Sequence, residues 1–317
     1  MDEFELIRHY LCAQNAQRDD VRLGIGDDAA VLRVPAGQEL AVSVDTLVAG
    51  VHFPAGLAAD AVGHRALAVN LSDLAAMGAE PAWALLALTL PETDERWIAG
   101  FARGLFALAQ DFNVALVGGN LARGPLNVSV TVHGFVPTGQ ALTRSGAGPG
   151  DQIFVTGHLG DAAAGLQKLQ ARADAHARDA CIRRFAFPEP RIEVGMALRG
   201  IASAAIDISD GLAADLGHIL EASGVGARLD VECVPLSSAL LKHGSREQAQ
   251  TLALVGGDDY ELCFSVPSER LAMLESRKDK LDCTVTGIGQ VTEVLGLRCV
   301  GKNGMDWKLN DLGYKHF

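Results

Sequence analysis

A stretch rich in glycine and proline divides this chain into two segments, each of which alternates between strand and helix patterns. The stretch "PTGQALTRSGAGPGD" occupies residues 137–151, and glycine and proline at this density interrupt regular secondary structure. Before it, alternating apolar residues predict strands over 39–48, 114–119 and 126–136. Apolar residues at helical spacing predict helices over 4–11, 61–78 (with a break near Asn70) and 94–112.

The second segment repeats this alternation. The sequence predicts a helix over 161–172 and strands over 152–157, 204–209 and 253–266. Such alternation predicts the α/β class with two domains rather than a repeat array. We therefore expect an N-terminal α/β domain over 1–137, a linker over 138–150 and a C-terminal α/β domain over 151–317.

Composition excludes several classes of protein. With 49% hydrophobic and 21% charged residues, the chain is typical of a folded globular protein. The longest apolar run is too short to cross a bilayer, and the N-terminus lacks the pattern of a signal peptide. Six cysteines without a C-x-x-C pair predict reduced thiols in a cytoplasmic protein. A formal net charge of −12 argues against nucleic acids and anionic membranes as partners.

Five short segments place aspartates beside small residues, at expected strand ends or helix starts. They are "GIGDDAAV" (24–31), "VSVDTLVAGVHF" (42–53), "VNLSDLAAMGA" (69–79), "IDISDGLAADL" (206–216) and "GGDDYEL" (256–262). Each alone is typical of a helix cap or a turn. Carboxylates gathered in one cleft, however, repel by about 4 kcal/mol per close pair at an effective dielectric near 20. Because Mg²⁺ reverses that sign, the set predicts a site in which Mg²⁺ bridges carboxylates and phosphates.

The familiar phosphate-binding motifs are missing from the sequence. It contains no P-loop and no kinase glycine-rich loop followed by a catalytic loop, and the calcium-binding EF-hand pattern is missing as well. Instead, Gly118, Gly119 and Asn120 follow a predicted strand, and we expect a turn there whose amide groups approach a phosphate. Arg144 is the cation best suited to fork onto phosphate oxygens, with a solvated linker arginine as the alternative.

These segments, together with "LTRSGAGPGD", "SGVGA" and the terminal "GYKHF", occur in the order in which the thiamine-monophosphate kinase family carries them. The chain resembles that family, a member of the aminoimidazole ribonucleotide synthetase-related superfamily, from about residue 4 onward. The resemblance implies ATP-dependent phosphorylation of thiamine monophosphate to thiamine diphosphate, with several Mg²⁺ ions. It also implies two α/β domains, the first with a mixed sheet that pairs across a homodimer.

The resemblance also implies roles for individual residues, matched by motif position. The implied Mg²⁺ ligands are Asp28, Ser43, Asp45, Asp73, Asn120, Asp207 and Asp210. The implied ATP contacts are Phe112, Gly119, Asn120, Arg144 and Ser209. The implied contacts to thiamine monophosphate are His52, Asp258 and Tyr314. The aromatic face of Tyr314 suits a cationic thiazolium ring.

Two of these positions depart from many relatives. Asn120 stands where they carry Asp, and Asp258 stands where they carry Glu.

No residue is expected to act as a distinct acid or base, because the attacking phosphate oxygen is already ionised and direct in-line transfer needs mainly positioning. Two other hypotheses remain open from the sequence: a sibling chemistry of the superfamily, and a non-catalytic nucleotide- or metal-binding regulator.

Overall fold

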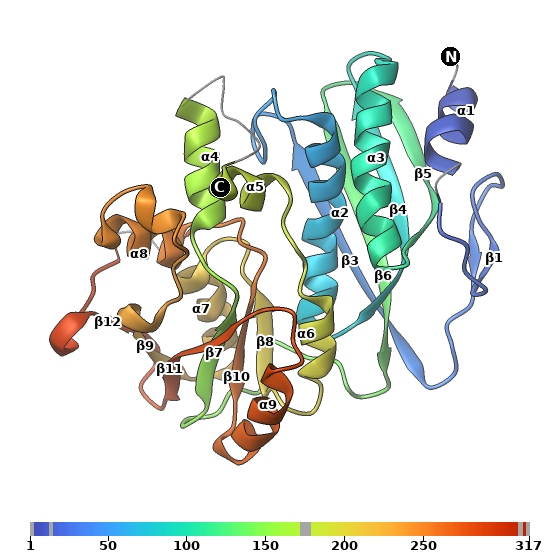
Figure 1. The fold of residues 1–317 in the computed structure, drawn as a ribbon. Coiled ribbons are helices and arrows are strands. Elements are labelled where there is room, and N and C mark those ends of the chain that lie inside the picture. Colours follow the sequence, from blue (N-terminus) through green and yellow to red (C-terminus); the bar gives the residue numbers. More distant parts are fainter. Residues whose placement is uncertain (1–2, 13–14, 172–178, 310–312, 315–317) are drawn as a thin grey trace. The chain divides into compact units, whose positions relative to one another are not determined.

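The computed structural model describes residues 3–12, 15–171, 179–309 and 313–314. It divides into two compact units, which we describe separately (Figure 1). The N-terminal unit comprises residues 1–74 and 79–139, and the C-terminal unit comprises residues 75–78 and 140–317. Each unit combines one main sheet with helices, which confirms the predicted α/β class.

The N-terminal unit contains a mixed four-stranded sheet in the order β3-β6-β4-β5. Only β4 and β5 are parallel. The strand bounds are β3 Gln38–Val48, β4 Glu80–Leu90, β5 Ala115–Arg123 and β6 Asn127–Pro137. Helices α2 (Ala59–Ala76) and α3 (Glu95–Asp111) cover one face of this sheet (Figure 1). Alternate residues of β6 face them, because Val128, Val130 and Val132 are buried while their neighbours are partly exposed.

A local signal in the sequence accounts for the start of α3 but not for the uninterrupted length of α2. The Asp94 side chain accepts hydrogen bonds from the backbone amides of Arg96 and Trp97 and so starts α3. The predicted break in α2 is wrong, since the helix runs through Asn70 without interruption. The Asn70 side chain donates to the Ala66 carbonyl 2.9 Å away, one turn earlier, so its polar group is satisfied inside the helix.

Smaller elements complete the N-terminal unit. Residues predicted as a helix over 4–11 form α1 (Glu3–Leu6) and the π-helix η1 (Ile7–Cys12). The ribbon of β1 (Val21–Leu23) and β2 (Val31–Leu32) packs on a cluster around Trp83 through Val21 and Leu32.

The C-terminal unit contains a six-stranded sheet in the order β12-β9-β11-β7-β10-β8. Only β12 and β9 are parallel. The strand bounds are β7 Gln152–Thr156, β8 Ala204–Asp207, β9 Gly226–Asp230, β10 Leu262–Val266, β11 Val285–Thr292 and β12 Gly296–Val300. The α-helices are α4 Asp161–Ala171, α5 Ala180–Ala186, α6 Ile192–Ala197, α7 Leu212–Ser223, α8 Arg246–Val255 and α9 Leu271–Lys278. Single 3-10 turns are η2 Val231–Cys233, η3 Leu240–Lys242, η4 Ser268–Arg270 and η5 Lys302–Gly304.

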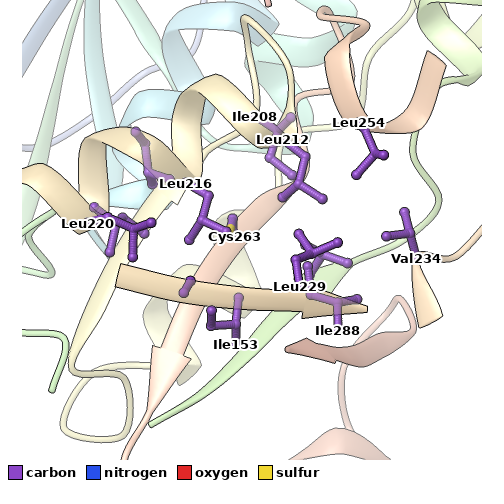
Figure 2. Packing of buried hydrophobic residues seen from close by; sticks show 14 of the residues in the cluster. Ile153, Ile208, Leu212, Leu216, Leu220, Leu229, Val234, Leu254, Cys263 and Ile288 are labelled. Atoms are coloured by element: carbon purple, nitrogen blue, oxygen red, sulfur yellow. The ribbon is translucent and has the colours of Figure 1, made fainter. Parts of the chain in front are cut away.

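The core of the C-terminal unit joins α7 and α8 to the sheet. Leu212, Leu216 and Leu220 of α7 belong to the same buried cluster as Ile153 of β7 and Ile288 of β11 (Figure 2). A full turn of helix separates successive leucines of this row, so they lie on one face. Burial of this apolar face holds α7 against the sheet, and with it the loop that precedes α7.

The predicted strand over 253–266 is wrong in its first half. Residues 253–255 end α8, and only Leu262–Val266 form β10. A capping box at Ser245 starts α8, and Ala249 and Ala253 continue its buried face at helical spacing. Residues 256–261 form the loop between helix and strand. Among the described residues, no helix combines the length and the apolar character needed to cross a membrane.

Candidate functional site

Three of the predicted site residues meet where α2 packs on β3. Ser43 and Asp45 are two residues apart on β3, so both side chains point to the face that α2 covers, and both are half-buried. Ser43 Oγ donates to Asp73 Oδ2 on α2 at 2.5 Å. The backbone amide of Asp45 donates to Asn70 Oδ1 at 2.9 Å. The structure therefore brings Ser43, Asp45 and Asp73 together.

Asn70 is a residue of this site that the sequence reasoning missed. It is fully buried and lies one helical turn before Asp73. Its carboxamide ties the α2 backbone to the amide beside the Asp45 side chain. The available signal was a polar residue inside an otherwise apolar run, three positions from an expected metal ligand.

Two further predicted residues of this unit lie near the ends of strands. His52 follows β3, and its Nδ1 accepts a hydrogen bond from the Val48 amide at 3.0 Å. Acceptance at Nδ1 leaves Nε2 as the protonated nitrogen of the neutral ring. Asp28 is exposed in the segment between β1 and β2, and its amide donates to Asp27 Oδ1 at 2.9 Å.

The predicted turn at Gly118, Gly119 and Asn120 is wrong, because all three residues lie inside β5. Gly119 pairs with Leu86 of β4 and has a φ of 153°. A Cβ atom at Gly119 would lie 1.9 Å from the Leu86 carbonyl oxygen. The close approach of two strands therefore requires this glycine.

The position of Asn120 separates it from Ser43 and Asp45, two other predicted metal ligands of the unit. It is exposed on β5, one edge of the sheet, whereas Ser43 and Asp45 lie on β3, the other edge. Three strand spacings of about 4.8 Å lie between these edges. The structure does not bring Asn120 beside Asp45.

Phe112, a predicted ATP contact, is half-buried and follows the last residue of α3, where its amide donates to the Leu108 carbonyl at 3.3 Å.

In the C-terminal unit, backbone hydrogen bonds join three segments that carry predicted site residues. Asp207 ends β8 and is buried, and Ser209 and Asp210 follow it. The Asp258 amide donates to the Ser209 carbonyl at 2.8 Å, and the Tyr314 amide donates to the Asp210 carbonyl at 3.1 Å. The structure therefore brings Ser209, Asp210, Asp258 and Tyr314 together.

Glycine makes this close approach possible. A Cβ atom at Gly257 would lie 2.3 Å from the Ser209 carbonyl oxygen. A Cβ atom at Gly313 would lie 2.5 Å from the Asp210 carbonyl oxygen, and the φ of Gly313 is 151°. Side chains at these positions would push the segments apart.

The loop over 257–261 has an unusual backbone. Asp258 and Tyr260 have φ values of 71° and 51°, in the left-handed region that residues other than glycine seldom adopt. Tyr260 Oη donates to Asp258 Oδ1 at 3.3 Å, and the Tyr260 amide donates to the Ile208 carbonyl at 2.8 Å. Such conformations persist where the surroundings over-determine them, and they concentrate at functional sites.

A buried ion cluster anchors the end of this loop. The Glu261 carboxylate is fully buried and accepts hydrogen bonds from Arg184, from Arg191 at 2.6 and 2.7 Å, and from Thr156 Oγ1 at 2.6 Å. Burial alone would lower the pKa of Arg191, but its bonds to Glu261 outweigh burial and hold that pKa above its ordinary value. Sequence reasoning missed Glu261.

Two other buried carboxyl groups hold backbone amides near the same loops. Asp259 Oδ2 accepts from the Gly160 amide at 2.8 Å, and burial raises the pKa of Asp259 well above its ordinary value. Asp215 Oδ2 accepts from the amides of Ser209, Asp210 and Gly211, each at 3.0 Å. Burial and the nearby charge of Asp210 raise the pKa of Asp215 to about 7.

Arg144 is exposed, and its carbonyl accepts a hydrogen bond from Ser223 Oγ at 3.3 Å.

Within the described ranges, no group of three or more His, Cys, Asp or Glu side chains is placed to hold a metal ion. Mg²⁺ commonly takes one or two carboxylates, several waters and the phosphates of a substrate. The donors present are oxygens, in pairs such as Ser43 with Asp73, and this donor set fits Mg²⁺.

Comparisons with known proteins cover both units. The family model of the AIR synthase related protein N-terminal domain matches residues 26–136, and that of the C-terminal domain matches residues 148–302. Thiamine-monophosphate kinase of Escherichia coli K12 is 51% identical over 99% of this chain and 98% of its own. The crystal structure of thiamine-monophosphate kinase from Stenotrophomonas maltophilia K279a is 46% identical, with a TM-score of 0.88 over 97% of this chain and 98% of that chain. The structure of AaThiL complexed with AMPPCP and TMP is 35% identical, with a TM-score of 0.79 over 92% of both chains.

Proposed function

Because this chain belongs to the thiamine-monophosphate kinase family, we propose that it phosphorylates thiamine monophosphate with ATP, giving thiamine diphosphate and ADP. The observation that carries this proposal is 51% identity to a thiamine-monophosphate kinase along essentially the whole length of both chains. A relative of the same fold has a solved structure in complex with the ATP analogue AMPPCP and TMP together, which supports direct transfer between two bound substrates.

The transfer forms one P–O bond and breaks another. A terminal phosphate oxygen of thiamine monophosphate attacks the γ-phosphorus of ATP, and the bridging oxygen leaves with ADP. The attacking oxygen is already ionised near neutral pH, since the second pKa of a phosphate monoester is about 6. The chain therefore needs no strong general base, which agrees with a predicted site built from carboxylates and hydroxyl groups. Its task is to position the substrates and to balance their charge.

We assign Mg²⁺ binding to oxygen ligands in each unit. In the N-terminal unit these are Asp28, Ser43, Asp45, Asp73 and Asn120, and in the C-terminal unit they are Asp207 and Asp210. When bound, Mg²⁺ neutralises charge on the phosphates. The contact of Ser43 with Asp73 supports the ligands on β3 and α2, and the bonded loop around Ser209 supports those of the C-terminal unit.

The remaining predicted residues bind the two substrates. We assign ATP to Phe112, Gly119, Asn120, Arg144 and Ser209, and thiamine monophosphate to His52, Asp258 and Tyr314. The Tyr314 ring is exposed beside Asp210, where it can present its face to a cationic thiazolium ring. Because Asp258 is one methylene shorter than Glu, we expect a water molecule to fill that gap in its contact with the substrate.

We also propose a cytoplasmic homodimer that pairs through the N-terminal sheet. The outer face of the edge strand β3 supports this pairing, because it exposes Leu40, Val42 and Val44, the last two at 55% and 59%. All six cysteines lie in described segments and carry free thiols, which supports a reducing compartment. Sedimentation of the protein and of Val44→Lys tests the pairing, since a charge on that face should yield monomers.

One assay tests the proposed function. Purified protein, ATP and Mg²⁺ should convert thiamine monophosphate to thiamine diphosphate, detected by chromatography, and should leave free thiamine unchanged. ATP binding without turnover would favour a non-catalytic regulator. Phosphorylation of free thiamine but not of the monophosphate would overturn the proposal.

A further inference from the structure

One buried carboxylate organises the loop that carries Ser209 and Asp210. Asp215 is the fourth residue of α7 and is 3% exposed. Its Oδ2 atom accepts hydrogen bonds from three consecutive amides, those of Ser209, Asp210 and Gly211, each at 3.0 Å. All three amides therefore point to one atom, which fixes the direction of each peptide plane.

This arrangement differs from an ordinary helix cap. The N-cap residue of α7 is Gly211, and no side chain at that position bonds to the helix. Asp215 instead reaches back from inside the first turn to amides four to six residues earlier. The apolar face of α7 is packed on the sheet through Leu212 and Leu216, so the carboxylate itself is anchored (Figure 2).

The carbonyl groups of the same loop have different partners. The Ser209 carbonyl accepts from the Asp258 amide, and the Asp210 carbonyl accepts from the Tyr314 amide. The amides of the loop thus bond to Asp215, and its carbonyls bond to segments assigned to thiamine monophosphate. A rotation of these peptide planes would displace the residues assigned to ATP and Mg²⁺ together with the attachment points of Asp258 and Tyr314.

We propose that Asp215 is a positioning residue for phosphoryl transfer, which holds Ser209 and Asp210 in the orientation that ATP with Mg²⁺ requires. The inference rests on the proposed function for the roles of Ser209 and Asp210. It adds a residue that acts through the loop backbone and contacts neither substrate. A displacement of about 1 Å at a reacting group can cost a hundredfold in rate, so the loss of three anchoring bonds should affect catalysis strongly.

Two substitutions separate the hydrogen-bond acceptor from the rest of the side chain. Asp215→Ala removes the acceptor, whereas Asp215→Asn keeps an oxygen that can receive the same amides. Asp179→Ala is the matched control, because Asp179 also accepts two amides, those of Cys181 and Ile182, but at the start of α5. Each variant is compared with wild type by hydrogen exchange at residues 209–211, calorimetric binding of AMPPCP with and without Mg²⁺, steady-state kinetics and thermal melting.

For Asp215→Ala we expect fast exchange at residues 209–211, AMPPCP binding weakened about tenfold with Mg²⁺ present, and kcat/KM for ATP lowered about a hundredfold. Asp215→Asn should retain slow exchange and lie within about tenfold of wild type in kcat/KM. Asp179→Ala should lower the melting temperature without changing exchange at 209–211 or AMPPCP affinity. If Asp215→Ala does not fold, Asp215→Asn and Asp215→Ser still test the acceptor.

Wild-type exchange and AMPPCP affinity in Asp215→Ala would overturn the proposal. So would an equal loss of AMPPCP affinity in Asp179→Ala, which would indicate general destabilisation. An Asp215→Asn variant as defective as Asp215→Ala, yet with protected amides, would also overturn it. Turnover of thiamine monophosphate by the wild-type protein tests the proposed function separately, because exchange at residues 209–211 does not depend on the reaction.

Discussion

The predicted site residues of the two units are held in place in different ways. In the N-terminal unit, Ser43 and Asp45 lie on a strand and Asp73 lies on a helix that packs against it. In the C-terminal unit, Ser209 and Asp258 lie on loops. The first group is held by the hydrogen bond between Ser43 and Asp73 and by the Asn70 carboxamide, which accepts from the Asp45 amide. In the second group, backbone hydrogen bonds join separate segments, and buried carboxylates lie beside them.

This difference follows from the backbone. A residue in a strand receives its direction from the pleat, so two residues at spacing two share a face without further help. A loop has no repeating geometry, and its polar backbone groups need partners wherever water is excluded. Buried carboxyl groups such as those of Asp215 and Asp259 supply partners for backbone amides in these loops. We therefore expect supporting residues to matter more in the C-terminal unit and the ligands themselves to matter more in the N-terminal unit.

The largest effect is expected at Glu261. Glu261→Ala removes the buried carboxylate that Arg184 and Arg191 share and leaves them, among the described carboxylates, only the exposed Glu189, at 3.4 and 3.6 Å. Breaking a buried ion cluster in this way costs about 3–5 kcal/mol. Urea unfolding should show a loss of that size. The exposed pair of Glu275 with Lys278 provides the control, since Glu275→Ala should change stability by less than about 1 kcal/mol. Equal effects of the two variants would contradict the importance of the buried cluster.

Asp45→Ala is expected to lower turnover without lowering stability, the reverse of what we expect for a supporting residue. It removes a proposed metal ligand from a regular strand, so turnover should fall by about a hundredfold or more while the melting temperature stays near that of wild type. Steady-state kinetics at ordinary Mg²⁺ concentration and a thermal melt provide the two measurements. Asp94→Asn, at the N-cap of α3, makes a similar removal of charge outside the site and should leave turnover intact. Activity of Asp45→Ala within a few-fold of wild type would refute the metal assignment.

A smaller effect is expected at Asn120, on the edge strand opposite β3. If the side-chain carbonyl oxygen of Asn120 binds Mg²⁺ associated with ATP, Asn120→Asp adds a negative charge beside that ion. The substitution should then strengthen Mg²⁺ binding by about 1 kcal/mol after desolvation. The half-saturating Mg²⁺ concentration should then fall several-fold. Gln110→Glu adds the same charge on α3 and should leave that midpoint unchanged. An unchanged midpoint in Asn120→Asp would exclude a metal role for this residue.

The smallest effect concerns an ion pair in the N-terminal unit. Burial raises the pKa of Asp20, but hydrogen bonds from Arg18 and Trp83 and the charge of Arg18 outweigh it, so the pKa lies below its ordinary value. A lowered folded-state pKa adds stability above the unfolded-state pKa of about 3.9, and this is lost as the pH falls through the folded value.

Asp20→Asn should therefore cost about 0.5–1 kcal/mol at pH 7, and the difference from wild type should shrink below about pH 4. Urea unfolding at several pH values measures this difference, and turnover at pH 7 should not change. If the difference in stability instead grew as the pH fell, the folded-state pKa of Asp20 would be raised rather than lowered.

The sequence predicted the elements whose signals are local. Alternating apolar residues located β3 and β6, and apolar residues at helical spacing located α3. The same alternation places Ser43 and Asp45 on one face, so part of the N-terminal site could be derived before any coordinates. The ordered motifs identified the family, and the comparisons confirm it.

Only the tertiary structure decided the features that depend on distant segments. Gly119 belongs to a strand because Leu86, 33 positions earlier, lies directly against it. The partners of Glu261 include Thr156, 105 residues away in the sequence. A short window contains the period of a helix or strand but not the identity of a non-local partner. The sequence therefore determined the class, the family and the shared face of Ser43 and Asp45 on their strand, whereas the loops and their buried supports follow from contacts that form only when the chain is folded.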